Sequence, residues 1–220
     1  ARQWSAPAGD FAVPGTAGRP WLLRTGTLVL IAVMLLIGGG VLMVWLPYHC
    51  NRAVMAEVER LGGKAYSRID RPECVPDAVD DEHLAVLERV TAIDLSRRQL
   101  NDADLEHLGA LTNLESLRLD RTQVSDEGLK HFRGLTTLLW LQLNDTPISD
   151  AGLVHIQGLV GLETLSLIHT KVSDVGLEHL KGLTNLKTVY LGGTAVTKAG
   201  INKLQKALPD CEIYWTPPAD

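Results

Sequence analysis

Apolar residues recur with a period of 24 residues along residues 89–208, and this period divides the stretch into five blocks without a gap. The blocks begin at Arg89, Asn113, Thr137, Gly161 and Asn185. Block positions 2, 5, 7, 12, 17, 20 and 23 are apolar in every block, 35 of 35 in total. A unit of this size cannot bury its apolar edge alone, so the pattern predicts stacked repeats that share one continuous core.

Each block is predicted to contain a strand, a turn and a short helix. Positions 5 and 7 alternate with other residues as in a half-buried strand, for example Leu117 and Leu119. Positions 17 and 20 have the spacing of one helical face, for example Leu129 and Phe132. Hydroxyl residues before that helix are predicted N-caps, and an aspartate column in the first turn is predicted to favour the helix dipole. The hydroxyl residues are Ser125, Ser149, Ser173 and Thr197, and the aspartates are Asp102, Asp126, Asp150 and Asp174.

The blocks share the pattern L-x-x-L-x-L, followed by a threonine and then by V-S-D-x-G-L-x-H-L-x-G-L, over about 125 residues from Arg89 to Trp215. This pattern resembles the leucine-rich-repeat family. The resemblance implies an α/β fold: a leucine-rich-repeat solenoid whose curved parallel sheet carries short helices on its convex side. The repeats look most like those of membrane-anchored bacterial members and of ubiquitin-ligase substrate receptors, although no F-box-like segment supports the second comparison. Many members carry asparagine or cysteine where this chain has Thr122, Thr146, Thr170 and Thr194.

Segments on both sides of the five repeats, which span residues 89–208, are predicted to cover the ends of the core. Residues 47–88 are a linker and N-terminal cap, with a helix over 51–61, a stop at Gly62 and Gly63, and a strand over 64–69 that could pair with the first repeat. A degenerate further repeat is predicted from His83, Leu84 and Leu87. Residues 209–220 are predicted to form a C-terminal cap strand and a tail.

Residues 25–46 carry no charge and are predicted to form a transmembrane helix that follows a disordered tail, residues 1–24. As a helix this segment would span roughly 33 Å, which is enough for the hydrocarbon core of a bilayer. The alternative is a cleaved signal peptide, but its apolar region usually has about 7–15 residues, and the nearest small-residue cleavage site, at Ala56, lies well beyond the segment.

Orientation in the membrane follows from the short tail and the position of Arg24 at the boundary of the apolar segment. Both favour an N-terminus inside and repeats outside the cytoplasm, so we expect a single-pass membrane protein with extracytoplasmic repeats. Because the chain begins with Ala1 rather than Met, its N-terminus is expected to be processed or incomplete.

Composition excludes several function classes. A formal net charge of −5 argues against a nucleic-acid-binding surface, which is normally basic. Three scattered cysteines do not form a disulfide framework, and Cys50 is expected to be an unmodified thiol, with acylation beside the membrane as the alternative. No catalytic arrangement, metal-ligand cluster or phosphate loop is recognisable, so we expect no enzymatic activity, no cofactor and no metal.

Two further sets of residues allow a functional and a structural interpretation. Five histidines recur every 24 residues; they form a row rather than the converging set that zinc needs, so we expect a structural column that hydrogen-bonds between repeats. They are His83, His107, His131, His155 and His179. Three arginines lie in turns after strands, where a GTPase-activating protein could insert one into its partner's active site. The alternative, which we favour, is that they are ordinary surface charges. They are Arg97, Arg98 and Arg121.

The candidate binding residues occupy block positions 4, 6 and 8, which repeat geometry leaves facing outward on the concave side of the sheet. An exposed tryptophan among polar residues has the composition of an interaction hot spot. The candidates are Arg118, Asp120, Trp140, Gln142, Asn144, Ile168 and Tyr190. We expect a membrane-anchored, non-catalytic module that binds a protein or peptide, without a nucleic-acid partner. The alternatives are a self-associating structural envelope protein and a partner-regulating substrate receptor.

Overall fold

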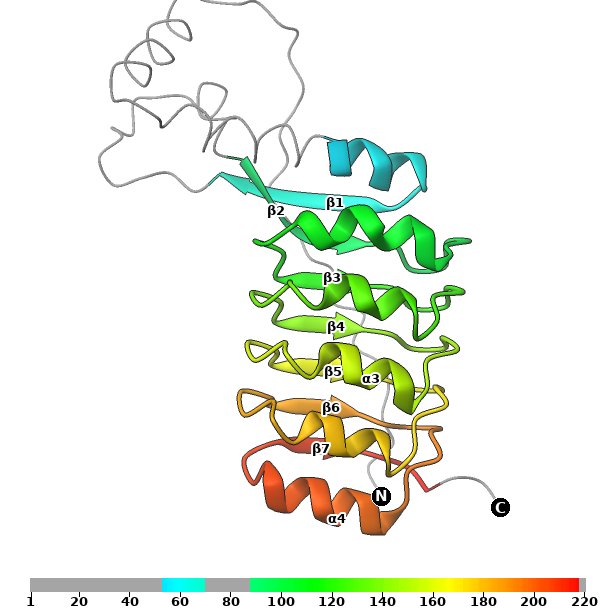
Figure 1. Cartoon of the computed structure of the whole chain (residues 1–220), viewed down its shortest axis with the longest axis vertical. Helices are drawn as coiled ribbons and strands as arrows, with labels where there is room; N and C mark the ends of the chain where they lie inside the picture. The colour runs from blue at the N-terminus through cyan, green and yellow to red at the C-terminus, as the bar shows by residue number, and fades with distance from the viewer. Residues whose placement is uncertain (1–52, 70–87, 218–220) are drawn as a thin grey trace, which may run out of the picture.

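The computed structural model describes residues 53–69 and 88–217, which form a single stack of strand–turn–helix units (Figure 1). Seven strands make one sheet in chain order, from β1 to β7. All neighbours from β2 to β7 pair in parallel, whereas β1 pairs with β2 antiparallel. The strands are β1 (Lys64–Ile69), β2 (Glu88–Asp94), β3 (Ser116–Arg118), β4 (Trp140–Gln142), β5 (Thr164–Ser166), β6 (Thr188–Tyr190) and β7 (Glu212–Tyr214).

A short helix follows each of β2 to β6 and lies on the same side of the sheet (Figure 1). Three of these five are 3-10 helices and two are α-helices. They are η2 (Asp102–Ala110), η3 (Gly128–Phe132), α3 (Asp150–Ile156), η4 (Gly176–Leu180) and α4 (Lys198–Ala207). The predicted leucine-rich-repeat solenoid, with a parallel sheet and short helices, is therefore confirmed.

Strand register stacks each residue on its counterpart in the neighbouring repeat. Leu117 pairs with Leu141, and Leu141 pairs with Leu165, so the shift between neighbours is one full repeat. Of the 35 predicted core positions, 33 are buried. The exceptions both lie in α4: Ile201 is partly buried and Ala207 is exposed. The core prediction was wrong at Ala207 because α4 continues for ten residues and buries Leu208 instead.

The aspartate column joins each repeat to the next one, a role that the sequence did not predict. The Oδ1 atom of Asp126 accepts the backbone N–H of Ser149 at 2.7 Å, and its Oδ2 accepts the Ser149 hydroxyl at 2.5 Å. The same pair of bonds joins Asp102 to Ser125, Asp150 to Ser173 and Asp174 to Thr197. The predicted position in the first helical turn holds for Asp102 and Asp150, but the carboxylates act mainly between repeats.

N-capping by the hydroxyl column is confirmed in two of four repeats. Ser149 caps α3 and Thr197 caps α4, each by accepting a backbone N–H from the first turn. For Ser125 and Ser173 the prediction was wrong, because η3 and η4 begin two residues later than expected. Their hydroxyls still accept N–H bonds at 3.3 Å in the preceding turn.

Threonine hydroxyls fix the turn that leaves each strand. Thr146 is buried and donates to the carbonyl of Leu143 at 2.6 Å. Thr122, Thr170 and Thr194 make the same bond to the leucine three residues earlier, at 2.7–2.8 Å. The bond is local, so a threonine satisfies the buried carbonyl within its own repeat.

Both ends of the core are covered within the described residues. Residues 53–60 are helical and bury Val54 and Val58 against the first repeat. The turn that follows this helix contains Gly62, whose φ is 74°, a conformation that glycine adopts without strain. At the other end, β7 extends the sheet as predicted, and the Trp215 indole donates to the carbonyl of Val196 at 2.9 Å.

The predicted tail (1–24), transmembrane segment (25–46), Cys50 and degenerate repeat with His83 lie outside the described residues. Among the residues that the structure does describe, no helix is both long enough and apolar enough to cross a membrane.

Candidate functional site

Strand alternation determines which side chains the sheet offers to a partner. The middle residue of each short strand is buried, as Leu141 is in β4, while the residues on either side of it point away from the core. We call the sheet face opposite the helices the open face; the strands contribute block positions 4, 6 and 8 of the repeats to it, and the turns that follow the strands form one of its edges. All seven candidate residues predicted from the sequence lie on this face.

Trp140 is a large aromatic side chain of the open face, with 41% of its surface exposed. It pairs in register with Ser116 on β3 and with Thr164 on β5, both small and polar. Trp140 is therefore an isolated aromatic side chain with small neighbours on both sides, so it has room to contact a partner.

Tyr190 belongs to a second aromatic site rather than to a cluster with Trp140. Its ring stacks on Tyr214 with centroids 5.0 Å apart and an interplanar angle of 15°. Strand β5 separates β6, which carries Tyr190, from β4, which carries Trp140. Sequence reasoning missed Tyr214, although it occupies the register position of Tyr190 in the predicted cap strand.

Arg118 and Gln142 lie side by side in the middle row of the open face. The Arg118 Nε atom donates to the Gln142 side-chain oxygen at 3.0 Å, and an Arg118 Nη atom lies 3.7 Å from a carboxylate oxygen of Asp94. The guanidinium is thus held by a neighbour on each side.

Asp120 and Asn144 are committed to holding neighbouring repeats together. Asp120 accepts the backbone N–H of Asn144 at 2.9 Å, and Asn144 accepts the N–H of Ile168 at 2.9 Å and the hydroxyl of Ser166 at 2.6 Å. Burial raises the pKa of the Asp120 carboxyl, because the hydrogen bonds from Asn144 and the Arg118 charge offset only part of the desolvation. These two residues shape the open face more than they offer it free groups.

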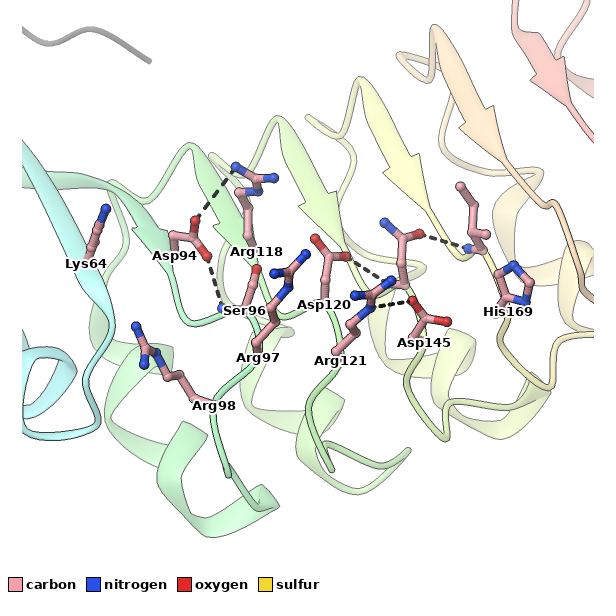
Figure 2. A pocket seen from close by; sticks show the side chains of 12 residues that line it. Lys64, Asp94, Ser96, Arg97, Arg98, Arg118, Asp120, Arg121, Asp145 and His169 are labelled. Atoms are coloured by element: carbon pink, nitrogen blue, oxygen red, sulfur yellow. Dashed lines mark hydrogen bonds and ion pairs between the residues drawn. The ribbon is translucent and has the colours of Figure 1, made fainter. Parts of the chain in front are cut away.

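A hollow of about 580 Å³ lies on the open face along the carboxyl ends of the strands (Figure 2). Arg118, Asp120, Asn144 and Ile168 line it, whereas Trp140, Gln142 and Tyr190 do not. The sequence candidates are therefore divided between the hollow and the adjoining surface. The hollow also includes Asp94 and Ser96, whose block positions 6 and 8 were predicted to face outward although neither was a candidate binding residue. Six further lining residues were not predicted there: Lys64, Arg97, Arg98, Arg121, Asp145 and His169.

One column at the rim of this hollow has an unusual backbone. Arg97, Arg121, Asp145 and His169 all have φ between 54° and 61°, in the left-handed region, and Gly193 completes the column at 69°. Their N–H groups continue the parallel ladder; for example, the Arg97 N–H donates to the carbonyl of Asp120 at 2.7 Å. The glycine in the fifth repeat was the one sequence signal for this conformation.

The histidine column shows one hydrogen bond of the predicted kind among the described residues. The His155 Nδ1 lies 2.7 Å from a guanidinium nitrogen of Arg133 in the preceding repeat, so its partner is an arginine rather than another histidine. In the part of the chain that the structure describes, no group of three His, Cys, Asp or Glu side chains converges on a metal-sized site.

Comparison with known proteins agrees with this architecture. Residues 110–132 match a family model for the leucine-rich repeat. An internalin from Listeria monocytogenes has a similar structure, with a TM-score of 0.50, 23% sequence identity and coverage of 59% of this chain and 35% of that one. No curated protein matches the chain.

Two further solved structures are similar at lower scores. The internalin C2 of the same bacterium gives a TM-score of 0.44 at 27% identity, covering 50% of this chain and 46% of that one. The leucine-rich-repeat ectodomain of a receptor kinase from Arabidopsis thaliana gives 0.42 at 15% identity, covering 78% of this chain and 97% of that one. The chain thus spans less than half the length of either internalin, and the likeness shows the fold alone.

Proposed function

We propose that this leucine-rich-repeat chain is a non-catalytic module that binds a protein or peptide through the open face of its sheet. Repeat folds of this kind are usually non-catalytic, and their exposed sheets are common binding surfaces. The observation that carries the proposal is Trp140, a large side chain left 41% exposed between Ser116 and Thr164. A rigid aromatic side chain that its own fold leaves uncovered is a typical binding anchor.

Selection of a displayed random-peptide library against the full chain tests this proposal. Peptides that bind should lose affinity about tenfold or more with Trp140→Ala, since the removal of an aromatic anchor typically costs at least 2 kcal/mol. Val175→Ala is the matched control, because Val175 is also exposed, at 65%, but precedes η4 on the helical side. Selected peptides that bind equally well to both variants would place the binding surface elsewhere.

Self-association is the second candidate function, and one observation favours it. Strand β7 ends the sheet in chain order, and its Tyr214 is 44% exposed, so another strand could pair at this edge. The charged Glu212 and the nearby Pro217 work against such pairing. Sedimentation of the full chain over a range of concentrations separates the two functions, since a simple receptor stays monomeric.

We further propose that residues 25–46 anchor the chain in a membrane and that the repeats lie outside the cytoplasm. The support is the run of uncharged residues itself, with Trp21 on one side and Trp45 and Tyr48 on the other, where interfacial aromatic residues are favoured. A tag placed after Asp220 should be removed when protease is added to spheroplasts. Protection of the tag would reverse the orientation, and a shortened chain in the soluble fraction would favour a cleaved signal peptide.

A further inference from the structure

The hollow on the open face is distinct in charge from the rest of the molecule. The chain as a whole has a net charge of −5, yet the hollow is lined by five Lys or Arg side chains against three carboxylates. Figure 2 shows Lys64 and Arg98 at the side nearest β1, with Arg97 between them and Arg121. The local excess of positive charge therefore comes from residues of several separate segments that the fold brings together.

Among the residues that the structure describes, two of these five cations have acidic partners and three do not. Arg118 lies 3.7 Å from Asp94, and Arg121 donates to Asp145 at 3.1 Å. Within the described residues, no acidic side chain pairs with Lys64, Arg97 or Arg98. The third carboxylate, Asp120, accepts the Asn144 N–H instead. The unpaired charge is thus concentrated at the β1–β2 end of the hollow.

An unpartnered polar atom lies in the same place. The Ser96 hydroxyl oxygen is buried and makes no hydrogen bond, although Ser96 lines the hollow beside Asp94 (Figure 2). In the next two repeats the equivalent positions hold Asp120 and Asn144, and both of these side chains bond to the following repeat. A buried hydroxyl without a partner is unusual, so this end of the hollow is less completely hydrogen-bonded than the equivalent positions of the next two repeats.

The hollow has the length of a short peptide. It runs from Lys64 on β1 to His169 after β5, four strand spacings, which is about 19 Å. An extended chain covers that distance with about six residues. Backbone bonds fix the rim, because the N–H groups of Arg97 and Arg121 continue the sheet ladder to Asp120 and Asn144. The cationic side chains therefore leave the backbone from defined positions.

We infer that this hollow binds an acidic peptide segment of a protein partner, an inference that rests on the proposed function of the open face. Carboxylates of the segment pair with Lys64, Arg97 and Arg98, and guanidinium groups can hold them in bidentate geometry. Asp94 and Asp145, interleaved with the arginines, accept N–H groups of a peptide but repel a polyphosphate backbone. This favours a peptide over a nucleic acid, which prefers a uniformly basic surface.

The test is fluorescence anisotropy with the full chain and a labelled octapeptide in which four glutamates alternate with serines. The glutamate peptide should bind, and a glutamine version should bind about tenfold more weakly or worse, because charge-assisted bonds are lost. Arg97→Gln combined with Arg98→Gln should weaken binding by at least about the same factor. Lys198→Gln combined with Lys206→Gln, an equal change of charge on exposed residues of α4, should leave it within about twofold.

Three outcomes would overturn the inference. In the first, the glutamate and glutamine peptides bind equally well, or neither peptide binds. In the second, the α4 control weakens binding of the glutamate peptide as much as the Arg97/Arg98 variant does. The third is equally tight, Arg97/Arg98-dependent binding of an eight-nucleotide thymidine strand, which would make the hollow a general polyanion site. If one of these outcomes occurs while library peptides still need Trp140, the proposed function stands and this inference alone fails.

Discussion

The carboxylate of Asp126 binds Ser149 of the next repeat twice, through the backbone N–H at 2.7 Å and through the hydroxyl at 2.5 Å. Because each of these bonds crosses a repeat boundary, the S-D-x-G segment joins neighbouring units as well as beginning a helix. Gly152 completes the arrangement, since a Cβ atom at this position would collide with the Asp126 carboxylate. This one contact thus explains why the serine, the aspartate and the glycine of the S-D-x-G segment recur in the repeats.

We call the pair of hydrogen bonds between Asp126 and Ser149 the clamp. Substitution of Gly152 tests how much the clamp contributes to stability. Gly152→Ala should lower the free energy of unfolding by about 1–3 kcal/mol, because the new methyl group forces the Asp126 carboxylate away from Ser149. Gly158→Ala is the matched control; no atom lies within 4 Å of a Cβ there, so its effect should stay within about 0.5 kcal/mol. Denaturant unfolding of both variants gives the comparison. Equal stability of the two would show that the clamp contributes nothing.

The repeat and its core could be predicted from the sequence because both depend on periodicity within one block. The role of Asp126 could not, since its partner Ser149 lies in another block and spacing within one block does not reveal contacts across blocks. Ala207 was misjudged for a related reason: the columns assume identical helices, and α4 is longer than the others.

The hollow was missed because its residues reach it from separate segments and through an unexpected backbone conformation. Arg97 and Arg121 have positive φ values, which the identity of an arginine does not suggest. Trp140 was found because the residue type and the strand position together indicate an exposed aromatic side chain. Tyr190 was placed on the same face, but its stacking partner Tyr214, which lies in the cap strand, was not among the candidates.

Asp120 should make stability depend on pH. Its pKa is raised above 3.8 by burial, so its contribution to stability is complete below pH 3.8 and is lost as the pH rises through the raised value. Asp120→Asn keeps an oxygen that can accept the Asn144 N–H, as Asn144 does for Ile168. The free energy of unfolding of this variant should therefore be at least as high as that of the wild type at pH 7. The difference between the two should shrink in acid.

Denaturant unfolding at pH 3.5 and pH 7 measures this difference. The control is Asp145→Asn, which changes an exposed carboxylate of the same hollow and should have a small effect, because surface ion pairs contribute about 0–1 kcal/mol. A loss of more than about 1 kcal/mol at pH 7 in Asp120→Asn, relative to wild type, would contradict the account.

Cys211 should be chemically inert in the folded chain. It is 3% exposed, and burial, with a smaller effect of the Glu212 charge, raises the pKa of its thiol to about 11. The thiolate is the reactive form, so iodoacetamide at pH 8 should leave Cys211 unmodified until denaturant is added. Peptide mass mapping measures the alkylation of this cysteine separately from that of the other two cysteines. Rapid modification under native conditions would mean that the C-terminal cap opens readily.

The most direct test of the account asks which face of the sheet a bound peptide touches. A photoreactive benzoylphenylalanine would replace Ser116, which pairs with Trp140 on the open face, or Ala151, which is exposed on α3. We expect a library-selected peptide to crosslink to the full chain carrying the probe at position 116 and not to the chain carrying it at 151. Crosslinking at 151 alone would contradict binding through the open face.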